Sequence, residues 1–100
     1  MSSAYASTGG DDSVGEGSFY PYRASKAALN NIAHTLAYDL KSQGIAVICI
    51  DPGWVRTDMG GPDATLSPEE SIKSVLSVVN CISEKHTGGY FDRSGQIMAF

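Results

Sequence analysis

The chain has 100 residues, 42% of them hydrophobic, and a formal net charge of −4. This length allows one domain at most, and the composition is that of a globular protein. The seven basic residues are scattered singly, which argues against a surface for nucleic acid or anionic lipid. No apolar run approaches the roughly 20 residues that cross a bilayer, and the first residues lack the basic and apolar segments of a signal peptide.

The two cysteines indicate the compartment that we expect. Cys49 lies in an apolar run and Cys81 in a helical pattern, and neither has neighbours at the spacing of metal ligands. Such cysteines are typical of reduced core thiols. We therefore expect a cytoplasmic protein without a metal site.

The first half of the sequence predicts a polar loop and then a long helix. Residues 5–19 are dominated by Gly, Ser and Asp and carry no hydrophobic period, which indicates an exposed loop. Residues 20–43 are expected to be helical, with Gly44 as the C-terminal stop. The apolar positions at helical spacing are Ala24, Ala28, Leu29, Ile32, Leu36 and Leu40.

A buried strand is expected next. Residues 45–50 (IAVICI) are apolar throughout, which suits a strand covered on both faces of a parallel sheet. The run ends in Asp-Pro-Gly, and the composition of residues 57–66 indicates a second loop.

The last third of the sequence predicts a second helix and a terminal strand. Ser67 and Glu70 have the spacing of a capping box and Pro68 suits the first helical position, so we expect a helix over 68–84. Its apolar stripe consists of Ile72, Val75, Leu76, Val79 and Ile82. Residues 90–100 indicate a strand, a turn and an extended piece.

This order of elements predicts a doubly wound α/β fold with a parallel sheet. Two or three parallel strands with two apolar faces cannot cover themselves, and no glycine-rich sequence of the dinucleotide-binding type follows a first strand. The elements therefore indicate about half of a larger α/β fold.

Tyr22 and Lys26 are the first candidates for a reaction centre. Residues four apart on a helix share a face, so the ammonium of Lys26 can lie near the phenol of Tyr22. A cation beside a phenol stabilises the phenolate, and tyrosine then becomes a usable general acid and base. On spacing alone, a packed tyrosine and a solvated lysine are the simpler interpretation.

The surroundings of this pair resemble those in the short-chain dehydrogenase/reductase family. YRASKAALN, which begins at Tyr22, resembles the catalytic helix of that family. A buried strand follows that ends in Pro52-Gly53, with Thr57 shortly after, and a Ser-Ser doublet stands at the start of the chain. With PGWVRTDMGG, the sequence is most similar to the sniffer and C-factor-like carbonyl reductases, over residues 1–4 and 17–100.

The resemblance implies three catalytic residues. Tyr22 is the acid/base that gives a proton to the carbonyl oxygen as hydride reaches its carbon. Lys26 favours the phenolate of Tyr22 and binds the ribose hydroxyls of the nicotinamide cofactor. Ser3 donates a hydrogen bond to the substrate oxygen. Ser2 and Ser7 remain alternatives, because Ser3 precedes Tyr22 by more residues than the family usually has.

The resemblance also implies cofactor-binding residues beside Tyr22 and Lys26. Pro52 and Gly53 let the backbone turn beneath the nicotinamide, and Val55 and Thr57 meet its carboxamide. Without the family, these residues indicate a strand-ending turn and a loop hydroxyl.

The resemblance implies the C-terminal half of a doubly wound, Rossmann-type parallel sheet, with the N-terminal βαβ half absent. It assigns the segments of one such partial domain over residues 1–100. Residues 1–4 are the end of the fifth strand, 5–19 the polar loop, 20–43 the catalytic helix and 57–66 the mobile substrate loop. The family's phosphate-binding loop, cofactor-selecting residue and active-site asparagine would all lie upstream of Met1.

The expected function is that of an NAD(P)H-dependent oxidoreductase of carbonyl or alcohol substrates, most similar to a carbonyl reductase, with NADP(H) favoured over NAD(H). The full-length form is expected to be a homo-oligomer, and the 100-residue chain alone is expected to be inactive. The alternative is a non-catalytic remnant or interaction module that associates with full-length homologues.

Overall fold

The computed structural model describes residues 1–9 and 19–100. The helices and strands are α1 (Tyr20–Leu40), β1 (Cys49–Asp51), α2 (Pro68–Cys81) and β2 (Tyr90–Asp92). Three short 3-10 helices, η1 (Ala4–Ala6), η3 (Lys41–Gln43) and η4 (Glu84–His86), accompany them. Most of the polar loop expected over 5–19 lies outside the described residues.

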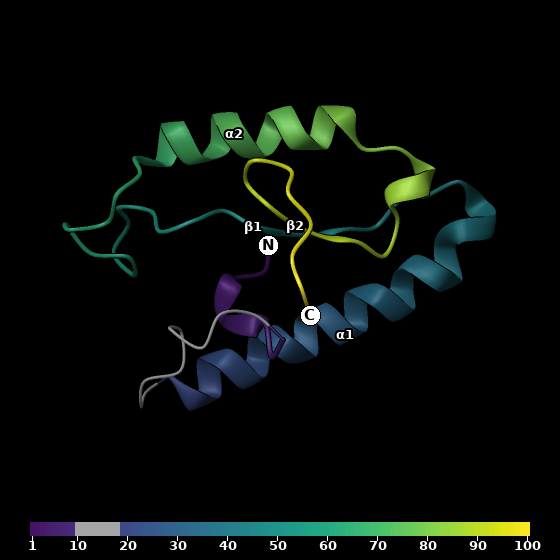
Figure 1. The fold of residues 1–100 in the computed structure, drawn as a ribbon, viewed down its shortest axis with the longest axis horizontal. Helices are drawn as coiled ribbons and strands as arrows, with labels where there is room; N and C mark the ends of the chain where they lie inside the picture. Colours follow the sequence, from purple (N-terminus) through teal and green to yellow (C-terminus); the bar gives the residue numbers. More distant parts are fainter. Residues whose placement is uncertain (10–18) are drawn as a thin grey trace.

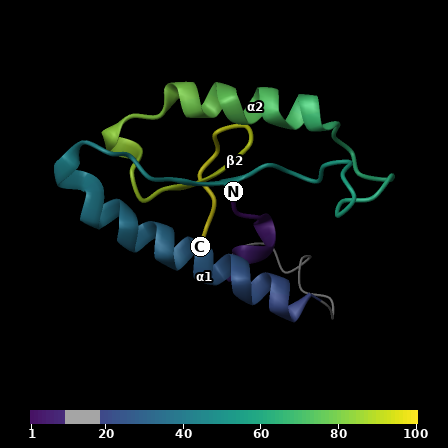
Figure 2. The ribbon, with the colours of Figure 1, turned by 180° about the vertical axis from the view of Figure 1, so that it is seen from behind.

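Two parallel strands lie between two helices. β1 pairs with β2 from Cys49 opposite Tyr90 to Asp51 opposite Asp92. α1 runs along one side of this pair and α2 along the other (Figures 1 and 2). α2 connects the two parallel strands, as the crossover of a βαβ unit does. The predicted α/β class with a parallel sheet is confirmed.

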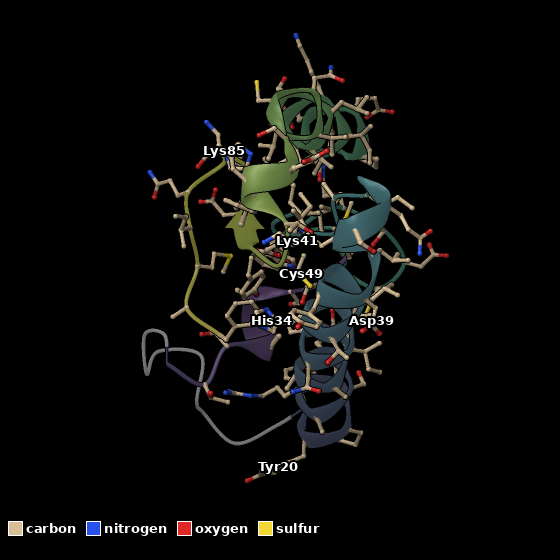
Figure 3. All side chains as sticks on the ribbon, turned by 90° about the vertical axis from the view of Figure 1, so that its right-hand side faces the viewer. Tyr20, His34, Asp39, Lys41, Cys49 and Lys85 are labelled. Atoms are coloured by element: carbon tan, nitrogen blue, oxygen red, sulfur yellow. The ribbon has the colours of Figure 1, made fainter. Side chains whose placement is uncertain are left out.

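The view along the layers shows how the helices cover the sheet. In Figure 3, Cys49 lies between the two helices, whereas Tyr20 points away from the molecule at the start of α1. The buried apolar residues of this core are Ala6, Ala37, Cys49, Ile50, Ala64, Val75, Tyr90 and Phe91.

The first strand is shorter and lies later than the predicted 45–50. The N–H of Ile45 donates to the carbonyl of Leu40, and so still belongs to the end of the helical segment. Val47 bonds with Thr87 and Gly88 rather than with a strand. Regular pairing therefore begins only at Cys49.

The helix ends follow local sequence signals. The N–H of Glu70 donates to Ser67 Oγ (3.1 Å) and that of Ser67 to Glu70 Oε2 (2.7 Å), so the predicted capping box is confirmed. The expected helix over 68–84 ends earlier, at Cys81. The expected helix over 20–43 is divided into α1 and η3, and it stops at Gly44, whose φ is 70°.

Both chain ends lie against the sheet. The N–H of Ser2 donates to the carbonyl of Ile50 (2.8 Å), which places the first residues beside β1. After β2 the chain turns back, and the N–H of Met98 donates to the carbonyl of Tyr90 (2.8 Å). Figure 1 shows the two termini between α1 and the strands.

The predicted apolar stripes of both helices are largely exposed. On α2, Val75 is buried while Leu76 is 53% exposed, and on α1 Ile32 is 62% exposed. The buried residues of α1 are instead Asn30 and Ala37. Two short strands offer too little surface to cover either stripe. No helix among the described residues is long and apolar enough to cross a membrane.

Candidate active site

A cavity of about 500 Å³ opens where η1, the start of α1 and the segment after β1 meet. Six of the residues predicted for the site line it, and Lys26 does not. These six are Ser3, Tyr22, Pro52, Gly53, Val55 and Thr57. The sequence thus predicted residues from three separate segments that share one cavity.

Tyr22 and Lys26 share a face in the first two turns of α1. The Lys26 ammonium lies over the Tyr22 ring, 5.6 Å from its centroid, within the range of a cation–π contact. The same ammonium donates to the carbonyl of Met1 (3.2 Å). Lys26 therefore joins α1 to the segment that carries the candidate serines.

The structure gives the three candidate serines different surroundings. Ser3 lines the cavity, and its Oγ accepts the N–H of Tyr5 (3.3 Å). Its hydroxyl hydrogen is not used by that bond. Ser2 is buried and donates to Asn30 Oδ1, away from the cavity lining. The Ser7 oxygen is buried, without a hydrogen-bond partner among the described residues, and is likewise not in the lining. The arrangement favours Ser3 over the other two.

The Pro52-Gly53 turn is held from both sides. Asp51 Oδ1 accepts the N–H of Gly53 (3.2 Å), and Ser71 Oγ in α2 donates to the carbonyl of Pro52 (2.8 Å). Gly53 has a φ of 81°, where a side chain is strained. Burial raises the pKa of the Asp51 carboxyl, although hydrogen bonds from the backbone of Gly53 and Ala4 act against it.

The segment over 57–66 is a closed loop with its own hydrogen bonds. The N–H of Arg56 donates to the carbonyl of Leu66 (2.8 Å), which joins the two ends. Trp54 Nε1 donates to the carbonyl of Gly60 (2.8 Å). The Thr57 hydroxyl accepts the N–H of Gly60 (3.1 Å), so it acts here as a loop hydroxyl as well as a wall of the cavity.

The sequence analysis did not predict several residues that line the cavity. Tyr5 and Phe19 lie at the ends of the predicted polar loop and pack near Tyr22, with the Tyr5 and Tyr22 rings 6.2 Å apart. Their signal was two aromatic residues flanking a polar segment. Trp54, left unassigned from the sequence, and Ser71 also line the cavity. For Ser71, no sequence signal separates it from the other serines of α2.

The lining suits one end of a nicotinamide cofactor. The cavity wall is mostly apolar with hydroxyls at Ser3, Tyr22 and Thr57, as a flat aromatic amide and a reacting carbonyl require. Among the described residues no turn with the sequence G-x-G-x-x-G leads from a strand into a helix, which is where the phosphates of a dinucleotide bind. No group of acidic, His or Cys side chains suited to a metal ion occurs in residues 1–9 and 19–100.

Comparison with known proteins identifies the class. The short chain dehydrogenase family matches residues 5–66, and this chain belongs to that family. With the parallel sheet between two helices, the fold is therefore part of a Rossmann-type domain.

This chain spans about half or less of the length of the similar proteins. The C-signal protein of Myxococcus xanthus is 44% identical over 80 residues, which are 80% of this chain and 48% of that protein. The carbonyl reductase Sniffer of D. melanogaster has a TM-score of 0.92 at 37% identity, over 100% of this chain and 39% of that one. An NADPH-bound carbonyl reductase from chicken fatty liver has a TM-score of 0.83 at 33% identity, over 99% of this chain and 40% of that one.

Proposed function

We propose that this chain carries the proton-transfer half of an NAD(P)H-dependent carbonyl reductase site. The observation that supports it most strongly is the single cavity that collects Ser3, Tyr22 and the Pro52-Gly53 turn. Similarity to two carbonyl reductases, one of them with NADPH bound, supports the same reaction class and favours NADP(H).

In the proposed reaction the nicotinamide cofactor supplies hydride to the carbonyl carbon. Tyr22 gives its hydroxyl proton to the carbonyl oxygen, so that the product is an alcohol and the phenolate is reprotonated from solvent. Ser3 donates a hydrogen bond to the same oxygen, and this bond strengthens as negative charge develops there. Lys26, which already lies over the Tyr22 ring, stabilises the phenolate and binds the ribose hydroxyls.

The cofactor-binding residues act through the turn and the loop. Pro52 and Gly53 keep the backbone clear of the nicotinamide, and Val55 and Thr57 contact its carboxamide. The loop over 57–66 covers the bound substrate. Family membership and the positions of all four residues in the cavity wall support these proposed roles.

The test uses a grafted enzyme, in which residues 1–100 of this chain replace the matching 39% of the Drosophila carbonyl reductase. We expect this enzyme to oxidise NADPH in the presence of a small ketone or aldehyde with saturation by both. The control is the same graft with Tyr22→Phe and Ser3→Ala. A correctly folded graft that binds NADPH but does not reduce any carbonyl would contradict the proposal.

A second candidate function is an interaction module for longer relatives. The observation that favours it is the exposure of apolar residues along both helices, Ile72 and Leu76 on α2 among them. Co-purification of the chain with a longer relative, without any change in that relative's turnover, would favour the module over the enzyme.

A further inference from the structure

The candidate serine is held by a buried polar cluster on the side away from the cavity. Tyr90 of β2 donates its hydroxyl hydrogen to the carbonyl of Ser3, across most of the sequence. Ser2 donates to Oδ1 of Asn30, which lies on the inner face of α1. Tyr90 is completely buried, and Asn30 and Ser2 are each only 3% exposed. We refer to Ser2, Asn30 and Tyr90 as the serine clamp.

The serine clamp and the neighbouring backbone bonds together fix the short segment formed by Ser2 and Ser3. The N–H of Ser2 is bound to Ile50 of β1, and the carbonyl of Ser3 accepts the N–H of Ala6 (2.8 Å) as well as the Tyr90 hydroxyl. β1, α1 and β2 therefore all form hydrogen bonds with the consecutive residues Ser2 and Ser3. A segment held from three elements can place the Ser3 hydroxyl hydrogen, which the bond from Tyr5 does not use, with little rotation of its backbone.

The chemistry of the clamp suits positioning rather than proton transfer. No atom of Asn30 or Tyr90 belongs to the lining of the site cavity. Burial, reinforced by the charge of Asp51, raises the pKa of Tyr90 to about 12. The Tyr90 hydroxyl thus keeps its hydrogen at every pH at which a reductase works and remains a constant donor.

We infer that Asn30 and Tyr90 are positioning residues of this chain, which act on the reaction through Ser3. The inference rests on the proposed function, because it assigns the purpose of the clamp to the Ser3 hydroxyl. The net stabilisation from one such hydrogen bond corresponds to about a tenfold factor in an equilibrium, which sets the expected size of the effect.

The kinetic test is a double-mutant cycle in the grafted enzyme. Tyr90→Phe keeps the buried ring and removes only the hydroxyl, and we expect kcat to fall about tenfold, with the KM for NADPH unchanged. In a Ser3→Ala background the same substitution should leave kcat unchanged. Tyr38→Phe is the matched control, since Tyr38 is 82% exposed on α1. An equal loss of kcat in both backgrounds, or none in either, would overturn the inference.

A further measurement separates this inference from the proposed function. Hydrogen exchange at the Ala6 amide, which bonds to the Ser3 carbonyl, should be faster in Tyr90→Phe than in the parent protein. If the parent graft reduces no carbonyl, the proposed function fails, and unchanged exchange at Ala6 would then also reject the clamp. Ser2→Ala, which removes the bond to Asn30, replaces Tyr90→Phe if the latter does not fold, with the same expected cycle.

Discussion

Tyr90 is a residue whose environment, rather than its type, decides what it does. It is the first residue of β2 and is fully buried, and its ring packs against Phe100 with the centroids 5.6 Å apart. An exposed tyrosine loses its proton near pH 10. In this chain burial raises the pKa of Tyr90 to about 12.

The raised pKa predicts how stability changes in alkaline solution. Because the folded chain holds this proton more tightly than the unfolded chain, the contribution to the free energy of unfolding is fully present below pH 10. It is lost as the pH rises from 10 through about 12. Urea unfolding of the grafted enzyme should show the free energy of unfolding falling across this pH range. Tyr90→Phe should remove the part of the fall that Tyr90 causes. An identical slope in the two proteins would contradict the assignment.

The turn beneath the cavity needs a glycine at Gly53 for two reasons, its backbone conformation and its close contacts. Gly61 shares only the first of these and serves as the comparison. Both have positive φ, 81° and 78°, which costs an alanine roughly 1 kcal/mol. A Cβ at Gly53 would also lie 2.7 Å from Leu66 Cδ1, whereas one at Gly61 meets nothing within 4 Å.

Gly53→Ala should therefore lower the free energy of unfolding more than Gly61→Ala does. Thermal or urea unfolding of the two grafted variants measures the difference, and carbonyl reduction should also suffer more in Gly53→Ala. Equal effects would mean that Leu66 moves aside without cost and that the turn is not tightly packed.

At the scale of elements, side chains help to hold the loop over 57–66: Arg56 Nη1 donates to the carbonyl of Ala64 (2.9 Å), and Trp54 forms a second such bond. Trp54 is 54% exposed, yet its Nε1 donates to the carbonyl of Gly60 in the first half of the loop. Trp54→Phe keeps an aromatic ring and removes this donor. We expect faster hydrogen exchange over residues 57–66 in the grafted enzyme, with Tyr38→Phe as the control. Unchanged exchange would show that the other bonds suffice to hold the loop, among them the backbone bonds of Leu66 with Arg56 and Trp54.

The elements also show what could be predicted from the sequence. The capping box of Ser67 and Glu70 and the stop at Gly44 depend on neighbours in the chain, so local patterns predicted them correctly. The start of β1 depends on Thr87 and Gly88, some forty residues away, and the prediction of 45–50 was wrong there. A local pattern contains no information about such a partner.

The residues of the candidate site also divide into those that could be predicted from the sequence and those that could not. The motif residues Tyr22 and Gly53 could be predicted because a family resemblance places them. Asn30 and Ser71 could not, because their contacts with Ser2 and Pro52 exist only once the helices are packed against the strands. In the sequence, Ser71 is one serine among several on α2, and only its burial separates it from them.

At the scale of the whole molecule, the exposed apolar residues of the helices decide how we expect the isolated chain to associate. Ile72, Leu76 and Val79 follow one another along α2 at helical spacing, and each is about half exposed. Burial of apolar surface is the main driving force for association, so we expect the isolated chain to self-associate or to seek a longer partner.

Charge placed on this face should oppose association. Leu76→Lys should lower the average mass measured by sedimentation of the isolated chain at a given concentration. Ser77→Lys adds the same charge one residue away, outside the apolar row, and should have a smaller effect. If the two variants behave alike, net charge rather than the apolar face controls association.

Single-turnover reduction of a ketone by the grafted enzyme tests most directly whether Tyr22 is the proton donor. Tyr22→Phe should slow the reduction by at least about 100-fold, the usual contribution of a general acid, while NADPH affinity stays within a few-fold of the parent. Tyr20→Phe is the matched control, because Tyr20 precedes it on the same helix and is 77% exposed. A Tyr22→Phe enzyme that reduces the ketone within a few-fold of the parent rate would contradict the account.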